Sequence, residues 1–140
     1  MAMVIAAQPR IDGASVEDSM GLGVLRAFQN ARRTIPVMTG EAQKAFLLAW
    51  KKELDSGTDM KAFAQPNPPW ISRNAIGIAA RLIAGRKLKP VPNNTIYYPI
   101  HQEVTQANLD QTLAGMKDKP DSYFLEEWFS EAQLDDLFTA

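Results

Sequence analysis

Short β-rich segments alternate with segments of helix length along most of the chain, and this alternation constrains the fold more than any other feature. Strands are expected over residues 11–16, 34–38, 61–65 and 95–100. Helices are expected between them, over residues 19–31, 41–54 and 70–84. A strand, a crossover helix and a further strand form a right-handed unit with parallel strands. The sequence therefore predicts an α/β protein with a parallel sheet built in βαβ layers.

Cap and turn residues mark the ends of the expected elements. Asp18 or Ser19 is expected to cap the first long helix. Gly57 interrupts the second helix and Gly85 closes the third. Pro99 puts the last strand at a sheet edge or ends it, because proline cannot donate to a strand ladder.

The last part of the chain changes to a helical pattern. Helices are expected over residues 105–114 and 121–128, and Ser130 with Gln133 forms a capping box for a final helix. Residues 1–9 look like the end of an earlier helix. We therefore expect an α/β unit over residues 1–104 and a helical, acidic tail over residues 105–140.

Charge is distributed unevenly along a chain whose formal net charge is only −1. Residues 1–100 hold 13 lysines and arginines against 7 acidic residues, whereas residues 101–140 hold 2 against 9. The acidic tail is either a solvated surface, which we favour, or a segment lying across basic residues of the body. The net charge gives no support to a nucleic-acid partner.

Several classes of chemistry find no support in the sequence. The chain has no cysteine, which excludes disulfides, cysteine nucleophiles and thiolate metal sites. His101 is the only histidine, and neither a G-x-S-x-G motif nor an EF-hand-like loop occurs. We expect no enzyme activity, metal or cofactor. Without a secretory signal or a long apolar run, the sequence as written also predicts a cytoplasmic location.

Polar side chains gather where the expected strands end. In open parallel sheets, ligands bind beyond the carboxyl ends of the strands. Carboxylates, a hydroxyl and amides suit a neutral ligand rich in hydroxyl groups, whereas a phosphate would require cations or a glycine-rich loop. The candidate ligand-binding residues are Glu17, Asp18, Thr39, Glu41, Gln65, Asn67 and Trp70.

Structural roles compete with ligand binding at most of these positions. Asp18 can be a helix cap, and Glu41 can favour a helix dipole. Thr39 and Asn67 can be turn residues, and Trp70 can pack at a helix start. A polar Gln65 at the end of an apolar strand needs a hydrogen-bond partner, which favours a ligand there.

Three further features are explained by packing alone. The glycines of the GLG segment at residues 21–23 permit close helix–sheet packing, since the segment falls short of G-x-G-x-x-G. Trp50 lies on the apolar face of its helix and is expected in the core, and Trp128 is expected to anchor the tail.

Three stretches together resemble the C-terminal half of ribose-type periplasmic sugar-binding proteins. They are IDGASVEDSMGLGVLRAFQNA, TIPVMTGE and MKAFAQPNPPWISRNAIGIAARLIAGRKLKPVP, and the resemblance extends over residues 11–108. It implies two α/β lobes joined by a three-stranded hinge, with a sugar bound in the cleft. It also implies a periplasmic protein that delivers the sugar to the permease of an ATP-driven (ABC) importer.

The resemblance carries over to individual positions. Glu17 and Asp18 match the Asn-Asp pair whose Asn contacts sugar, and Thr39, with Glu41 nearby, matches the Asp of a Gly-Phe-Asp-Gly turn. These departures leave the identity of the ligand open. Gln65 directly matches the glutamine of the hinge strand.

The resemblance also implies that the helix within residues 70–89 belongs to the other lobe. Most of its circumference is apolar, so it is expected to be buried on more than one side. We expect a truncated protein in which this helix folds back on its own sheet or forms a homodimer through residues 70–84. The alternative, the effector-binding domain of a lactose-repressor-type regulator, would need an upstream helix-turn-helix.

Overall fold

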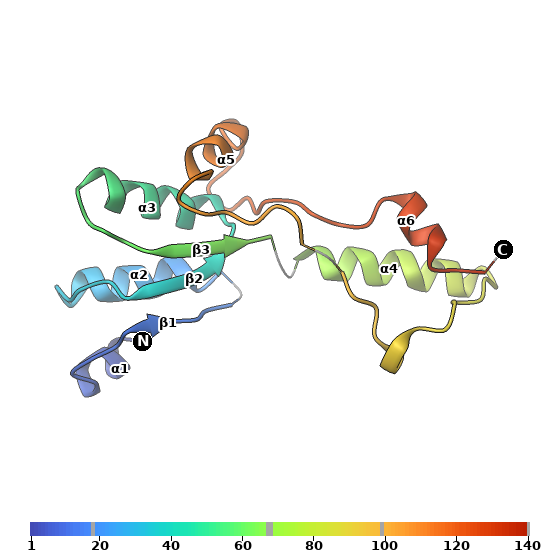
Figure 1. The fold of residues 1–140 in the computed structure, drawn as a ribbon, viewed down its shortest axis with the longest axis horizontal. Helices are drawn as coiled ribbons and strands as arrows, with labels where there is room; N and C mark the ends of the chain where they lie inside the picture. The colour runs from blue at the N-terminus through green and yellow to red at the C-terminus, as the bar shows by residue number, and fades with distance from the viewer. Residues whose placement is uncertain (18, 67–68, 99, 140) are drawn as a thin grey trace. The chain divides into compact units, whose positions relative to one another are not determined.

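The computed structural model describes residues 1–17, 19–66, 69–98 and 100–139 and has an α/β architecture (Figure 1). The elements, in chain order, are α1 (Ala2–Ala7), β1 (Gly13–Ala14), α2 (Gly21–Asn30), β2 (Val37–Glu41), α3 (Lys44–Asp55), β3 (Ala62–Gln65), α4 (Pro69–Ile83), the 3-10 turn η1 (Pro92–Asn94), α5 (Leu109–Gly115) and α6 (Glu131–Asp136). No helix of the described residues is long and apolar enough to cross a membrane.

The strands form a parallel sheet in the order β1-β2-β3. Gly13 pairs with Val37 between the first two strands, and β2 pairs with β3 from Met38–Ala62 to Glu41–Gln65. The crossovers between these strands contain α2 and α3. The expected α/β class with parallel βαβ layers is therefore confirmed.

Residue contacts divide the chain into two compact units. The sheet unit contains Met1–Pro66 and Gln102–Leu125, and the α4 unit contains Asn67–His101 and Glu126–Ala140. The chain thus passes between the units three times. The functional division expected after residue 104 remains a prediction.

The core of the sheet unit lies between the sheet, α2 and α3. Phe46 of α3 packs beside Gly21 of α2 and Gly40 of β2, where added Cβ atoms would lie 3.1 and 2.6 Å from its ring. Trp50 is fully buried, as expected. Of the two GLG glycines, only Gly21 serves close packing, because open space surrounds Gly23.

The α4 unit is built on contacts between α4 and the end of the chain (Figure 1). Gly77 of α4 packs against Leu134 of α6, where an added Cβ would lie 2.7 Å from a leucine methyl. The buried Asn74 side chain accepts a 2.9 Å hydrogen bond from the Phe129 amide. The expected capping box is present: Ser130 and Gln133 bond each other reciprocally at the start of α6.

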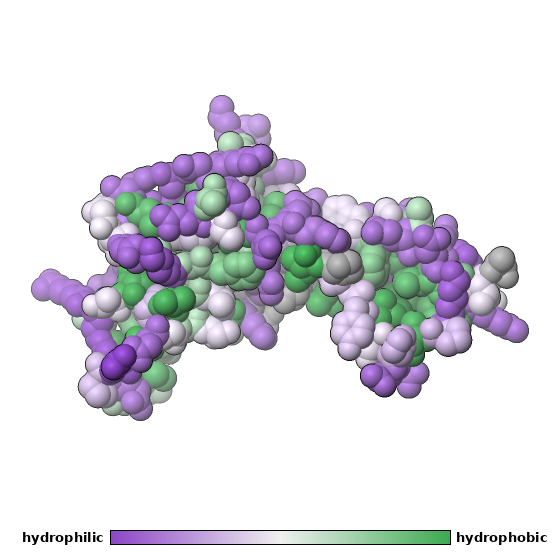
Figure 2. Space-filling model, in the orientation of Figure 1, coloured by the Kyte–Doolittle hydropathy of each residue, from purple (hydrophilic) through white to green (hydrophobic). Residues whose placement is uncertain are grey.

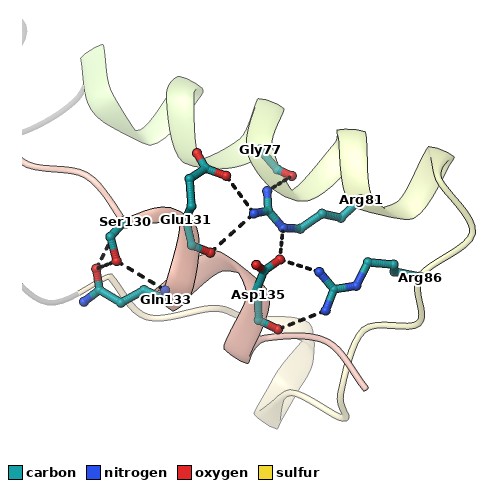
Figure 3. A network of polar contacts seen from close by, with 7 residues as sticks. All are labelled: Gly77, Arg81, Arg86, Ser130, Glu131, Gln133 and Asp135. Carbon is teal, nitrogen blue, oxygen red and sulfur yellow. Dashed lines mark hydrogen bonds and ion pairs between the residues drawn. The ribbon is translucent and has the colours of Figure 1, made fainter. Parts of the chain in front are cut away.

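Ion pairs of α6 with Arg81 of α4 and with Arg86, which follows α4, change the interpretation of the acidic tail (Figure 3). Asp135 accepts hydrogen bonds from Arg81, at 2.8 Å, and from Arg86. Arg81 also contacts Glu131 at 2.8 Å. These tail carboxylates remain exposed, but they pair with arginines of the body. The structure therefore agrees with the alternative in which the acidic tail lies across basic residues, and not with the solvated surface that we favoured.

Two expected elements are wrong. Within residues 95–98 and at residue 100 the structure has no strand, and the described sheet contains β1, β2 and β3 only. Residues 121–128 are not helical. The Lys44 amide donates to the Tyr123 carbonyl, and the Leu125 amide donates to the Ala42 carbonyl. These long-range bonds use backbone groups that a helix would have paired internally.

Other boundaries shift for local reasons. The Met20 backbone, rather than a Ser19 side chain, occupies the cap position of α2, and Asp18 lies outside the described residues. Thr105 does not start a helix, because its amide donates to the Asn108 side chain in a turn and α5 begins at Leu109. The ends of the two long helices are confirmed: Gly57 and Gly85 have φ of 86° and 84°.

Candidate functional site

The polar residues expected beyond the second strand are themselves part of β2. Thr39 and Glu41 lie in its last three residues, and Gln65 is the last residue of β3. The structure therefore corrects the expected strand over residues 34–38, because backbone pairing with β3 continues to the Glu41–Gln65 pair.

The register brings four side chains together on one face of the sheet. Thr39 lies opposite Phe63, and Glu41 lies opposite Gln65. Side chains two residues apart share a face of a strand, so all four belong to the same face. A hydroxyl, a carboxylate and an amide thus lie on neighbouring positions at the carboxyl ends of β2 and β3.

The loop after β1 reaches the same edge of the sheet. The Val16 amide donates a 3.1 Å hydrogen bond to Thr39 Oγ1, and this hydroxyl also lies 3.3 Å from Ser15 Oγ. Glu17, the next residue, is exposed, and its carbonyl accepts a hydrogen bond from the Met20 amide. The ends of all three strands therefore contribute polar groups to one edge.

Glu41 is the most buried of the candidate residues that the structure describes. Its side chain is 5% exposed, and the Ser19 amide donates a hydrogen bond to its Oε2. A hydrogen bond from a backbone N–H stabilises a buried carboxylate. Glu41 thus attaches the segment before α2 to the end of β2, which gives it a structural role alongside any ligand contact.

Trp70 belongs to the α4 unit, where it packs against another aromatic residue. Its ring centroid lies 5.1 Å from that of Trp128, and the two planes are tilted by 53°. The Arg73 guanidinium lies 3.8 Å from the centroid of Trp128. These contacts agree with the packing role for Trp70 and with the expected anchor role for Trp128. Asp18 and Asn67 lie outside the described residues.

His101 has a partner in the structure that no sequence pattern indicates. Glu127 Oε1 lies 2.8 Å from His101 Nδ1 and accepts a second hydrogen bond, also 2.8 Å, from the His101 amide. Tyr98 donates its hydroxyl to the Glu127 carbonyl. Since 26 residues separate His101 from Glu127, no local pattern could have indicated this pair.

Burial alters the chemistry of the Tyr98 hydroxyl. Desolvation, assisted by the negative charge of Glu127, raises the pKa of Tyr98 to about 12. The phenol is therefore a hydrogen-bond donor at neutral pH. Among the described residues, no three histidines or carboxylates are grouped closely enough to hold a metal ion.

The architecture defines the class: an α/β protein with a parallel sheet and polar groups at the carboxyl ends of its strands. Comparison with protein-family models, with curated proteins and with solved structures found no match to this chain.

Proposed function

We propose that this chain is a substrate-binding component of an ABC-type sugar importer, which binds a sugar or similar polyol non-covalently in a cleft and catalyses no reaction. The observation that carries the proposal is the alignment of Thr39, Glu41 and Gln65 at the carboxyl ends of adjacent parallel strands. Hydroxyl, carboxylate and amide groups together can accept from and donate to sugar hydroxyls.

The path of the chain agrees in part with the resemblance. It crosses between the two compact units after Pro66, His101 and Leu125. A hinge of three strands between two lobes is what the resemblance to ribose-type binding proteins implies. The first crossing directly follows β3, which supports matching Gln65 to the hinge-strand glutamine.

Two partners follow from the proposal. The first is the permease of the importer, which would receive the sugar from the full-length form of the protein. The second is another copy of this chain, bound through the exposed face of α4. Ile76 and Ile83 are 70% and 88% exposed, and apolar side chains gather over α4 at the surface (Figure 2).

Sugar binding is tested by titrating the 15N-labelled chain with neutral aldopentoses and aldohexoses and recording amide spectra. One lobe covers a ligand on one side only, so we expect affinities in the millimolar range. The expected result is a saturable shift of amides near Ser15, Thr39 and Gln65. Failure of every sugar to shift these amides, or shifts confined to other parts of the chain, would contradict the proposal.

Matched glutamine variants sharpen the test. Gln65→Ala should weaken binding by about tenfold, because an amide that bonds a ligand hydroxyl contributes about 1 kcal/mol or more. Gln111→Ala changes an exposed glutamine of α5 and should leave binding unchanged. Equal binding by Gln65→Ala and the wild type would remove Gln65 from the site.

A further inference from the structure

A groove between α1 and α2 lies outside the proposed sugar site. Its walls are mainly small or aliphatic: Ala2, Ile5 and Ala6 from α1, and Gly23 and Ala27 from α2. The groove has a volume of about 680 Å³. This size falls within the roughly 300–1,000 Å³ that small-molecule sites occupy.

Gly23 leaves the wall of the groove open. Apart from the chain neighbours and the backbone of α2 itself, no described atom lies within 4 Å of the position that a Cβ on Gly23 would take. A ligand can therefore approach the backbone of α2 at this turn. Gly21, two residues earlier, faces Phe46 in the core, so the two glycines serve different surfaces of α2.

Arg33 holds the two walls of the groove together. Its Nη1 donates hydrogen bonds of 2.6 Å to the carbonyls of Ile5 and Gln8, and its Nη2 donates one of 2.7 Å to Pro9. These bonds satisfy carbonyls at the end of α1 that have no partner within the helix. The hydrogen bonds of Arg33 therefore help to hold α1 against α2, in addition to apolar packing.

Arg26 gives the groove an available positive charge. Its side chain is exposed and makes no hydrogen bond or ion pair within the described part of the chain. The charged lining residues of the groove are Arg26 and Arg33, and none of the acidic residues that the structure describes lines it. An apolar surface with an available guanidinium at its rim is complementary to a molecule with an aliphatic body and an anionic end.

We propose that the groove between α1 and α2 binds a small aliphatic carboxylate. The carboxylate pairs with Arg26, and the aliphatic chain lies along Ile5, Ala6, Gly23 and Ala27. Guanidinium binds a planar carboxylate through two parallel hydrogen bonds, which orients the ligand at the rim. Burial of methylene groups then adds affinity with chain length, while Arg33 serves as a structural support.

The test uses decanoate, below its micelle-forming concentration, and 15N spectra of the full chain. The expected result is a saturable shift of the Gly23, Arg26 and Ala27 amides, with clearly weaker binding of decyltrimethylammonium, which has the opposite charge. Equal binding of both amphiphiles, or shifts outside the groove, would overturn the proposal. A dimer that forms without ligand and covers these residues would also overturn it.

Two pairs of variants locate the site. Arg26→Gln should reduce decanoate affinity by about tenfold, whereas Arg32→Gln, at an exposed arginine outside the groove, should not. Gly23→Leu should abolish binding by filling the groove. Ala2→Phe fills the groove from the α1 side, at an exposed residue. It provides a second test of the groove if Gly23→Leu fails to fold. Undiminished binding by Arg26→Gln or by a folded filling variant would refute the site.

Discussion

A Cβ atom on Gly40 would lie 2.6 Å from Cε1 of Phe46, so β2 and the first turn of α3 meet at a distance that only glycine permits. Phe46 is 1% exposed and packs against Gly21 of α2 as well. A single ring thus joins the sheet to both crossover helices. The Phe46 ring therefore helps to fix the position of β2, the strand that carries Thr39 and Glu41.

Gly40→Ala should destabilise the protein. The new methyl group overlaps ring atoms of Phe46, which cannot move away as the end of a flexible side chain could. Overpacking of this kind costs about 1–3 kcal/mol. Urea unfolding followed by tryptophan fluorescence measures the loss.

Gly23→Ala is the matched control for Gly40→Ala. It adds the same methyl group within α2, where nothing lies within 4 Å, so it should stabilise the helix by about 0.5–1 kcal/mol. The double variant Gly40→Ala/Phe46→Leu should lose less unfolding free energy than the two single variants together, because the smaller leucine relieves the contact with the new methyl group. Wild-type stability of Gly40→Ala would show that the ring is not confined as described.

Asp135→Asn should loosen α6 from α4. The hydrogen bond from Arg81, and to a smaller extent the one from Arg86, holds the pKa of Asp135 below its ordinary value. The stabilisation that comes from this lowered pKa is fully present above the pKa of an aspartate in the unfolded chain, about 4. It is lost as the pH falls through the lower pKa of the folded state. Hydrogen exchange of the α6 amides at pH 7 and in acid measures the effect.

Asp136→Asn provides the comparison for Asp135→Asn. Asp136 is exposed, and its carboxylate makes no ion pair among the described residues. Its replacement should leave the protection of α6 amides near that of the wild type. Faster exchange in both variants alike would mean that general charge, rather than the arginine contacts, secures α6.

Tyr98→Phe should change stability at alkaline pH. Because burial raises the pKa of Tyr98 to about 12, folding favours the neutral phenol. This contribution is complete below about pH 10 and is lost as the pH rises toward 12. The difference in unfolding free energy between wild type and Tyr98→Phe should therefore narrow between pH 10 and pH 12.

Ultraviolet titration provides a second measurement for Tyr98. The absorbance change of tyrosinate near pH 12 should disappear in Tyr98→Phe, and the components at lower pH should remain. An unchanged alkaline titration curve in this variant would contradict the burial and hydrogen bonding described for its hydroxyl.

Ile76→Lys should produce a monomer if α4 forms the proposed homodimer. The side chain is 70% exposed, so a lysine there leaves the folded unit intact but places a charge in the interface. Light scattering across a concentration series measures the molecular mass. Met3→Lys, at an 86% exposed residue of α1, should leave the dimer unchanged. A wild-type chain that stays monomeric at high concentration would refute the homodimer.

Local signals predicted several elements well. The capping box at Ser130 and Gln133 was predicted from two residues three positions apart, and its bonds lie within one turn of helix. Residues 61–65 closely match β3, and Gly85 ends the α4 helix with a positive φ. Such features depend on neighbours in the sequence, so a pattern can reveal them.

The candidate site was predictable only in part. The end of β3 at Gln65 follows from its apolar run, but the extension of β2 to Glu41 depends on pairing with β3. The pairing of Glu127 with His101 depends on how the chain returns to the α4 unit. Neither relationship leaves a local pattern, because the partners are brought together by packing.

By itself the sequence determined the α/β class, the alternation of strands and helices that makes the sheet parallel, the capping box of α6 and the glycines that follow α3 and α4. These properties arise from side-chain periodicity and backbone preference over a few residues. Tertiary structure alone decided that residues 123–125 lie beside Ala42 and Lys44 and that residues 95–98 remain outside the sheet. The reason is that a backbone N–H or C=O group is satisfied equally well by a partner in a distant segment or by one within a local helix. Only the packing of the whole chain decides which partner it takes.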